Sequence, residues 1–346
     1  MESPPASAPA GDAELDELLS RPTTVDIAAM EALDGDLLIL GAGGKMGPSL
    51  AQLARRASDA AGGVRRIVAV SRFPRRELMG DLAAHRIETI ACDLLDPTGL
   101  AALPDAPNVV FMAGQKFGTT GNPAETWALN AWLPAQVIQR FRDARLVVFS
   151  TGNVYPLVPV TGGGARETDP VAPVGEYAQS ALARERLVTF FAARGGTAAA
   201  ILRLNYAVEL RYGVLRDLAD RIGARQPVDL TMGWVNVIWQ RDANAVALRV
   251  LAAAAIPPLV LNVTGVEPLR VRDLAARIGE GLGIPPVFAG TETDTALLSN
   301  AARCHARFDP ATVDPLTACD WVASWVRRGG RSLGKPTHFE ERGGAF

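Results

Sequence analysis

The chain has 346 residues, of which 48% are hydrophobic and 21% charged, and this is enough apolar chain for one large α/β unit or two modest domains. The 35 basic and 37 acidic side chains leave a net charge of −2, and a balance so close to zero argues against a nucleic acid or an anionic membrane surface as the main partner. The three cysteines and three histidines show no metal-ligand spacing, so no metal site is predicted.

The N-terminal stretch is rich in Pro, Ala and Ser, lacks Lys and Arg, and precedes an acidic run, which is not the pattern of a signal peptide. The most apolar window, at 250–263, is interrupted by Pro257 and Pro258 and is too short to cross a bilayer as a helix. We therefore expect a cytoplasmic protein. Residues 1–35 are expected to form a mobile tail and a short helix at 25–33.

From residue 36 onward, short β-branched runs alternate with longer amphipathic ones, which is typical of βαβ units in a parallel sheet. The short runs are almost continuously apolar, so we expect helices to cover both faces of the sheet. The pattern predicts strands at 37–40, 67–70, 87–91, 109–113, 146–150 and 199–204, and helices at 48–61, 124–141 and 176–193.

After residue 204 the pattern weakens into Arg-rich mixed segments, which predict a smaller second lobe. Helices at 243–254 and 271–281 and a strand at 259–263 are expected there, and part of 234–263 is expected to return to the main sheet. The predicted organisation is a tail and short helix at 1–35, a doubly wound α/β domain at 36–205, and mainly a substrate-binding lobe at 206–346.

A glycine-rich turn follows the first predicted strand directly and leads into a helix. Glycines permit a tight turn and close approach of the backbone to a diphosphate, while the next helix offers unpaired N–H groups and the positive end of its dipole. The spacing is GxxGxxG rather than GxGxxG. The turn predicts a dinucleotide site in a Rossmann-type domain, formed by Gly41, Gly43, Gly44, Lys45, Met46 and Gly47.

The end of the second predicted strand normally carries an acidic residue when the cofactor is NAD. Ser71 and Arg72 stand there, and a hydroxyl beside a guanidinium can hold a 2′-phosphate through charge-assisted hydrogen bonds. The sequence therefore favours NADP(H), with NAD(H) as the alternative; the other interpretation is that the arginines only solvate a loop. Asp93 and Leu94 follow the third strand, where Asp93 is placed to accept a hydrogen bond from adenine.

The chain keeps only three lysines, Lys45, Lys116 and Lys335, against 32 arginines. A lysine that survives such a bias is a candidate for a chemical role.

These residues resemble the extended short-chain dehydrogenase/reductase superfamily, the NAD-dependent epimerase/dehydratase group, over about residues 36–330. The matching pieces are the glycine turn, Asp93-Leu94, the strand end at Ala113-Gly114, and the segments at 150–155, 176–180 and 261–268. The resemblance implies a Rossmann fold with a smaller C-terminal lobe and an NAD(P) cofactor lying along Ala113 and Gly114. It also implies a homodimer formed through the helices at 124–141 and 176–193.

The resemblance implies that Thr151 binds the substrate oxygen and that Tyr177 acts as general acid or base. The family's lysine four residues after the tyrosine, which would lower the phenol pKa and hold the nicotinamide ribose, is Ala181 here. Either another cation substitutes or redox chemistry is weak. Lys116, just beyond Ala113, is the predicted substitute, with a solvated loop lysine as the alternative. Asn130 is expected either to organise the site or to make a structural hydrogen bond.

Asn153, Asn205 and Arg211 are the predicted substrate-binding residues, because amide and guanidinium groups can hold a phosphate or carboxylate; charged groups on a solvated surface are the alternative. We predict an NAD(P)-dependent oxidoreductase or epimerase acting on a hydroxylated, sugar-like small molecule. Ala181 leaves open a redox-inactive NAD(P)-binding sensor or interaction protein, and also a lyase or isomerase without hydride transfer.

Overall fold

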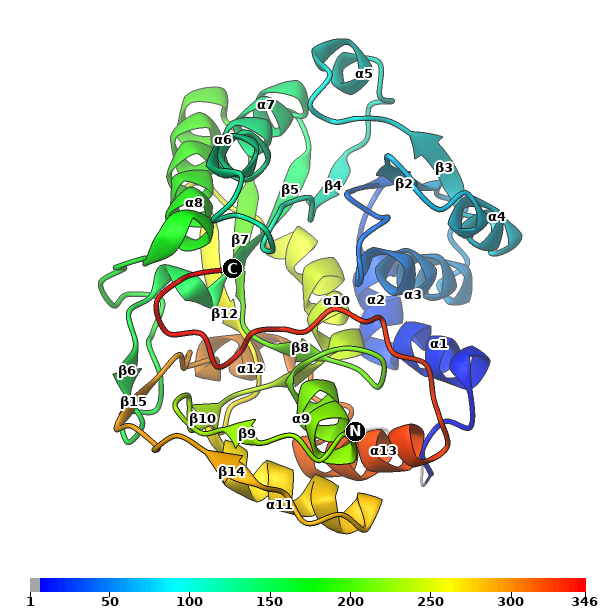
Figure 1. The fold of residues 1–346 in the computed structure, drawn as a ribbon. Coiled ribbons are helices and arrows are strands. Elements are labelled where there is room, and N and C mark those ends of the chain that lie inside the picture. Colours follow the sequence, from blue (N-terminus) through cyan, green and yellow to red (C-terminus); the bar gives the residue numbers. More distant parts are fainter. Residues whose placement is uncertain (1–6) are drawn as a thin grey trace.

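Seven parallel strands form the central sheet of the chain, of which the computed structural model describes residues 7–346 (Figure 1). The strand order is β12-β7-β5-β4-β1-β2-β3. Because this order reverses between β1 and β4, the crevice beyond their carboxyl ends is where such a sheet binds ligands. This topology confirms the predicted doubly wound fold. The strands are β1 (Leu37–Leu40), β2 (Ile67–Ser71), β3 (Glu88–Ala91), β4 (Asn108–Phe111), β5 (Arg145–Thr151), β7 (Ala199–Leu204) and β12 (Leu259–Val263).

Helices cover both faces of this sheet, as the continuously apolar strands require. In β1, Leu37 and Ile39 pack into a core with α2 (Thr24–Glu31), α3 (Gly47–Ala60) and α10 (Gln240–Arg249). Leu38 and Leu40 point to the opposite face, into a core with α5 (Pro97–Ala101), α7 (Leu133–Arg140) and α8 (Gly175–Gly195). The short α4 (Glu77–Ala84) connects β2 to β3.

The predicted helix at 124–141 is interrupted by a π-helical turn. It consists of α6 (Pro123–Trp127), η1 (Ala128–Trp132) and α7, and in η1 the N–H of Leu133 bonds the carbonyl of Ala128, five residues back. Such π turns displace the side chains and carbonyls of a helix from their ordinary partners. Asn130 lies in this turn.

The N-terminal region contains one helix more than predicted. The predicted helix at 25–33 corresponds to α2, and the structure adds α1 (Asp12–Ser20), whose Leu15 and Leu19 are fully buried in the core of the second lobe. In the sequence, acidic residues lie between the apolar residues of α1, so this apolar stripe is not evident. Residues 1–6 of the predicted tail lie outside the described residues.

The second lobe packs around α9 (Val214–Gly223), α11 (Val271–Leu282) and α13 (Pro315–Arg327), with α12 (Ala302–Phe308) against β12. Within residues 234–263, α10 packs on α3 and β12 pairs with β7 of the central sheet. Four two-stranded pieces complete the lobe: β6 (Val158–Pro159) with β15 (Thr295–Ala296), β8 (Ala207–Val208) with β11 (Ile238–Trp239), β9 (Val228–Asp229) with β14 (Phe288–Ala289), and β10 (Trp234–Val235) with β13 (Leu269–Arg270).

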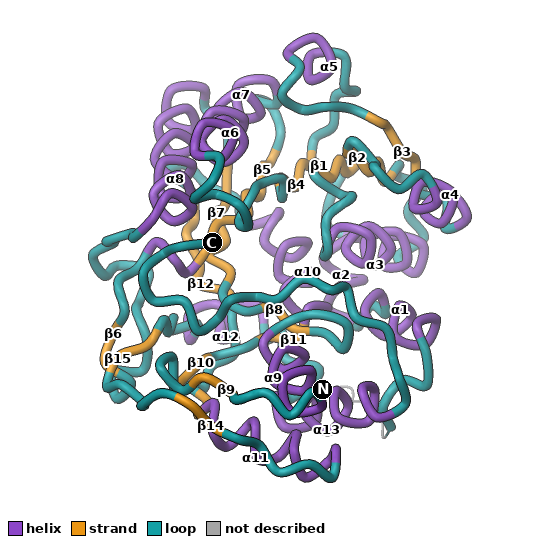
Figure 2. The backbone as a smooth tube through the Cα atoms, viewed as in Figure 1, coloured by secondary structure: helices purple, strands orange, loops and turns teal. Residues whose placement is uncertain are grey.

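Beyond α13, the C-terminal segment runs across the middle of the molecule, between the sheet domain and the second lobe, and ends near α8 and β7 (Figures 1 and 2). Within residues 7–346, none of the helices combines the length and apolar character that a bilayer span requires.

Candidate functional site

Several of the predicted site residues lie at the carboxyl edge of the sheet. The glycine turn follows β1, Ser71 ends β2, Gly114 follows β4 and Thr151 ends β5. Tyr177 comes to this edge from the first turn of α8, where its phenol interacts with the side chain of Thr151.

The glycine turn is packed too closely for side chains. Gly41 has a φ of +94°, and a Cβ there would lie 2.5 Å from the backbone nitrogen of Ala113. A Cβ at Gly43 would lie 2.5 Å from Oγ of Ser71, and one at Gly47 would lie 2.3 Å from the carbonyl oxygen of Ala42. The ends of β1, β2 and β4 can therefore converge only if these positions are glycine.

The same turn presents free backbone donors. Gly44 donates its N–H to the carbonyl of Gly41 at 3.2 Å, whereas the N–H groups of Gly43, Lys45 and Met46 find no acceptor within residues 7–346. They stand at the N-terminus of the fourteen-residue helix α3. Unpaired amides beside a helix N-terminus fit a diphosphate, so the turn suits a dinucleotide.

The end of β2 combines a half-buried hydroxyl with exposed cations. Ser71 faces Gly43, and Arg72, Arg75 and Arg76 are exposed, with no ion pair in the described part of the chain. At the end of β3, exposed Asp93 accepts a hydrogen bond from the N–H of Leu95 at 3.0 Å, and Leu94 is buried.

Thr151 is held by Asn153 in a defined orientation. Oγ1 of Thr151 accepts from the backbone N–H of Asn153 at 3.1 Å and from Nδ2 of Asn153 at 2.9 Å. A hydroxyl has two acceptor positions and one donor, so its O–H remains for the phenol of Tyr177. The structure thus places Asn153, predicted to bind substrate, on the hydroxyl of Thr151.

Burial raises the pKa of Tyr177 above its ordinary value, while the hydrogen bond from Thr151 and the positive charge of Arg184 act in the opposite direction. Position 181 does not contribute, because Ala181 is 1% exposed and packs against apolar neighbours such as Val154 and Leu182.

Arg184 is the functional candidate that the sequence analysis missed. It lies two helical turns beyond Tyr177 on α8, is buried, and bonds the carbonyl and side chain of Asn130. The sequence signal that could have found it is the seven-residue spacing, which returns to the same helix face.

The structure does not bring Lys116 to Tyr177. Nζ of Lys116 donates to the carbonyl of Thr337 at 3.1 Å and lies 4.4 Å from the ring centroid of Phe346. Burial lowers the pKa of Lys116 to about 8. This lysine therefore holds the C-terminal segment in the present arrangement.

Lys45 of the glycine turn and Lys116 both lie over the ring of Phe117. Nζ of Lys45 lies 3.3 Å from the ring centroid of Tyr212 and 4.7 Å from that of Phe117. Burial, followed by the positive charges of Lys335 and Lys116, lowers the pKa of Lys45 to about 7. A cation cluster with this character attracts an anion.

The C-terminal segment, residues 335–346, covers Tyr177. The backbone oxygen of Phe346 accepts from the N–H of Thr119 at 3.0 Å, and the Phe346 ring stands edge-on to Tyr177 with centroids 5.7 Å apart. Access to the phenol therefore requires this end of the segment to move.

The remaining predicted substrate residues have protein partners. Nδ2 of Asn205 donates to Oδ1 of Asn236 at 3.2 Å, and Asn205 is buried beside Gly152. Arg211 pairs with Glu209 and with Asp12 and Asp16 of α1. The structure thus does not bring Arg211 to the site, because three carboxylates already neutralise it.

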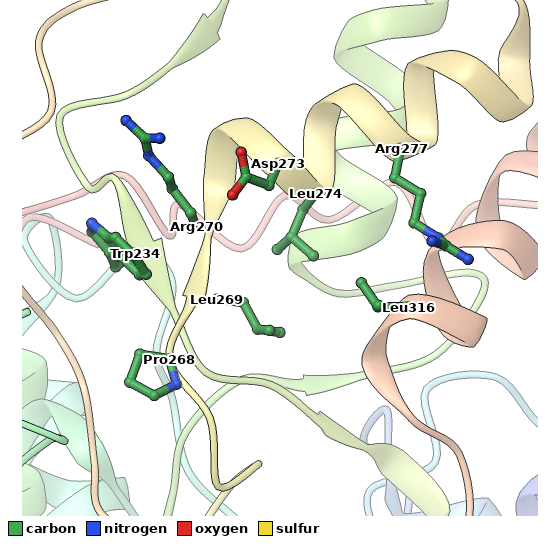
Figure 3. Close-up of a pocket in the computed structure, with 8 residues that line it drawn as sticks. All are labelled: Trp234, Pro268, Leu269, Arg270, Asp273, Leu274, Arg277 and Leu316. Carbon is green, nitrogen blue, oxygen red and sulfur yellow. The ribbon is translucent and has the colours of Figure 1, made fainter.

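A separate pocket of about 390 Å³ lies on the second lobe, between β10, β13, α11 and α13 (Figure 3). Trp234, Leu269 and Leu274 form its apolar part, and Arg270, Asp273 and Arg277 its polar part. None of its lining residues belongs to the elements that carry the glycine turn, Thr151 or Tyr177.

The comparison with curated proteins finds a dTDP-6-deoxy-L-talose 4-dehydrogenase (NAD(P)(+)) from Kitasatospora kifunensis, 28% identical over 209 residues. This match spans 55% of the chain and 64% of the relative, so the chain covers less than two thirds of that protein's length.

Solved structures share the fold. MoeE5 in complex with UDP-glucose and NAD has a TM-score of 0.67 and 20% identity, covering 85% of this chain and 99% of its own. The UDP-glucuronic acid 4-epimerase from Bacillus cereus, in complex with UDP-glucuronic acid and NAD, has a TM-score of 0.70 and 17% identity, with coverage of 85% and 99%.

A family model for the NAD dependent epimerase/dehydratase family matches residues 37–216. This span is half of the chain and includes the glycine turn, Thr151, Tyr177 and Arg184. The edge of the sheet that gathers these residues is thus the matched part of the molecule, and the chain belongs to the NAD-dependent epimerase/dehydratase family.

Proposed function

We propose that the chain is an NAD(P)-dependent oxidoreductase or epimerase that acts on a hydroxylated, sugar-like molecule, with a nucleotide-linked sugar as the best candidate. The observation that carries this proposal is that Thr151, Tyr177 and the open amides of the glycine turn lie at the same sheet edge. The relatives described above support this substrate class, because one is named for a dTDP-linked sugar and the two solved structures contain a UDP-linked sugar or sugar acid.

In this proposal the protein residues hold the substrate and transfer its proton. A bound nicotinamide would supply the acceptor or donor of the hydride. The O–H of Thr151 would bind the substrate oxygen, and Tyr177 would take the hydroxyl proton during oxidation and return it during reduction. The end of the C-terminal segment would have to leave Tyr177 before the substrate binds, because Phe346 covers the phenol.

The test is a panel of UDP- and dTDP-linked sugars and sugar acids, each incubated with NAD or NADP. Net oxidation or reduction appears as a change in nicotinamide absorbance, whereas epimerisation needs product analysis by NMR because it leaves the absorbance unchanged. Turnover of any panel member supports the proposal. Absence of both signals in a chain that still binds dinucleotide favours the redox-inactive sensor, for which the buried Ala181 is the supporting observation.

We further propose that NADP(H) is the preferred cofactor, because Ser71 and the unpaired Arg72 stand at the end of β2. Arg72→Ala is expected to weaken NADP binding about tenfold or more, since a hydrogen bond to a charged group contributes about 1.5–3 kcal/mol. Binding of NAD is expected to stay unchanged. Calorimetric titration measures both, and exposed Arg145, at the start of β5, is the matched control as Arg145→Ala. Equal losses for the two dinucleotides would contradict the preference.

Dinucleotide affinity is expected to fall as the pH rises through 7. Because the pKa of Lys45 is about 7 in the free protein, this lysine is charged below that pH and can attract a diphosphate directly. Above pH 7 Lys45 is neutral and must take up a proton when the dinucleotide binds, so the Kd of the dinucleotide is expected to rise roughly tenfold per pH unit. Fluorescence titration from pH 6 to 8.5 measures this slope. Lys45→Arg, which stays charged throughout, is expected to flatten it, and a flat profile for the native chain would reject the role.

We also propose a homodimer formed through α6, η1, α7 and α8. Three large apolar side chains on these helices are exposed, namely Trp127, Trp132 and Phe190. Phe190→Glu is therefore expected to shift the chain from dimer to monomer in light scattering after size exclusion. Val64→Glu, at a fully exposed position outside these helices, is the control and is expected to leave the mass unchanged. A native chain that is monomeric at micromolar concentration would contradict the proposal.

A cytoplasmic location stays part of the proposal. Cys92, Cys304 and Cys319 are all free thiols, as a reducing compartment would keep them.

A further inference from the structure

Arg184 is a buried cation without a carboxylate partner. Arg184 is 6% exposed, and no Asp or Glu within residues 7–346 forms an ion pair with it. The adjacent Glu185 is engaged elsewhere, by Arg203 at 2.6 Å and by the hydroxyl of Ser150 at 2.6 Å. A buried charge without a counter-ion is costly, so its retention calls for a physical reason.

The guanidinium of Arg184 is held by neutral oxygen atoms. Its Nε donates to the carbonyl of Asn130 at 2.9 Å, a second nitrogen donates to Oδ1 of Asn130 at 3.0 Å, and the third donates to the carbonyl of Phe149. The Asn130 carbonyl is available because the residue four positions later, Pro134, has no N–H to donate. The missing donor at Pro134 therefore leaves the Asn130 carbonyl as an acceptor that positions the arginine.

The position of the cation is constrained from the side of β4 as well. A Cβ at Gly114 would lie 2.8 Å from a guanidinium nitrogen of Arg184 and 3.0 Å from Oδ1 of Asn130. Oδ1 of Asn130 also accepts the N–H of Gln115 at 2.8 Å, so the same amide ties the loop after β4 to the arginine. Glycine at 114 thus lets the cation lie directly under the edge of the site.

Arg184 shares α8 with Tyr177, seven residues further on, and donates to the carbonyl of Phe149, two residues before Thr151 in β5. The ionisable group placed to gain from this charge is the phenol of Tyr177. The guanidinium lowers the pKa of Tyr177 against the effect of burial, and the phenol in turn raises the pKa of Arg184, which burial lowers. Tyr212, from the second lobe, interacts electrostatically with the phenol, whereas Lys116 contacts the ring of Phe346, which stands edge-on to Tyr177. Tyr212 is uncharged when protonated, and Lys116 is bonded to Thr337.

We infer that Arg184 is the positioning residue of this site: its charge stabilises the phenolate of Tyr177 during proton transfer, in place of the side chain that Ala181 cannot provide. This inference rests on the proposed function for the meaning of the proton transfer, but the electrostatic link itself does not need a known substrate. The proton balance is simple, because Tyr177 gives or takes one proton and Arg184 stays protonated throughout.

The experiment reads the Tyr177 phenol directly in the full chain. Only four tyrosines are present, so uniform incorporation of 3-fluorotyrosine gives four fluorine signals, and Tyr177→Phe assigns the one of interest. Ring fluorination lowers a phenol pKa by electron withdrawal, which brings the titration into a range that the fold tolerates. We expect the Tyr177 midpoint in Arg184→Met to lie about one pH unit or more above that of the unsubstituted chain.

Three further variants make the result specific. Arg184→Lys keeps the charge, so its Tyr177 midpoint is expected to stay close to that of the unsubstituted chain. Arg184→Gln keeps a donor for the Asn130 carbonyl but loses the charge. It therefore tests the inference if Arg184→Met does not fold. Arg186→Met removes an exposed arginine of the same helix and is expected to change nothing. Lys116→Met tests whether Lys116, the cation that the sequence predicts to replace the missing lysine, sets the Tyr177 midpoint instead.

An unchanged Tyr177 midpoint in Arg184→Met and Arg184→Gln would overturn the inference, and so would a shift seen in Lys116→Met alone. If a substrate is found, the pH profile of kcat/KM is expected to move by the same amount as the fluorine titration. If no substrate is found, the proposed function fails while the titration still decides the role of Arg184.

Discussion

Tyr177→Phe is expected to lower kcat by about 10²- to 10⁴-fold, because the phenol is the group proposed to transfer the proton and general acid or base help contributes that much. Dinucleotide affinity is expected to stay within a few fold, since the amides of the glycine turn, not the phenol, are proposed to hold the diphosphate. Steady-state turnover of the substrate identified in the panel, with a parallel binding titration, separates the two effects.

Tyr155→Phe is the matched control. The Tyr155 hydroxyl donates to Oδ1 of Asn262 at 2.9 Å and accepts from Arg203 at 2.6 Å, so its removal leaves a buried arginine with one acceptor fewer. This variant is expected to lose about 1–3 kcal/mol of stability, seen in urea unfolding, with kcat little changed. If Tyr177→Phe kept native turnover, Tyr177 would not be the proton-transfer group.

Asp26→Asn is expected to destabilise the chain by about 3–5 kcal/mol, because it leaves two buried arginines without their common carboxylate. Asp26 is fully buried, pairs with Arg241, and accepts from Nε of Arg249 at 2.7 Å. These contacts tie α2 to α10 beneath the sheet. Denaturant unfolding monitored by circular dichroism measures the loss.

The pH dependence of this loss follows from the Asp26 carboxyl. Burial raises its pKa, but Arg241 and Arg249 more than compensate and lower it below the ordinary 3.8. A lowered pKa in the folded state means that the stabilisation is fully present above the ordinary value and disappears as the pH falls through the folded value. The difference between native chain and variant should thus be constant from pH 7 to 5 and shrink only in strong acid.

Asp105→Asn is the control for this second prediction. Asp105 pairs with Arg140 at 2.6 Å, but its side chain is 90% exposed, and exposed ion pairs contribute at most about 1 kcal/mol. Equal losses for Asp26→Asn and Asp105→Asn would show that burial of the network does not matter.

Local sequence patterns were sufficient to predict the sheet and the glycine turn. β1 and the turn are contiguous, and the glycines of the turn fall within seven residues, so the pattern of residues 37–47 carries both the strand and the expected diphosphate site. The loss of the lysine at position 181 is likewise visible in the chain itself. By contrast, the apolar stripe of α1 became interpretable only against the second lobe that buries Leu15 and Leu19.

The sequence by itself therefore determined the doubly wound fold, the place of the dinucleotide turn and the identity of Thr151 and Tyr177 as candidates. Only the tertiary structure decided where the two candidate cations lie, because Arg184 meets Asn130 across 54 residues while Lys116 bonds Thr337 across 221. Lys116 follows β4 and Arg184 lies within α8, and their spacing in the chain cannot rank them. The choice depends on which acceptors the fold leaves unpaired, and that is a property of segments brought together in space.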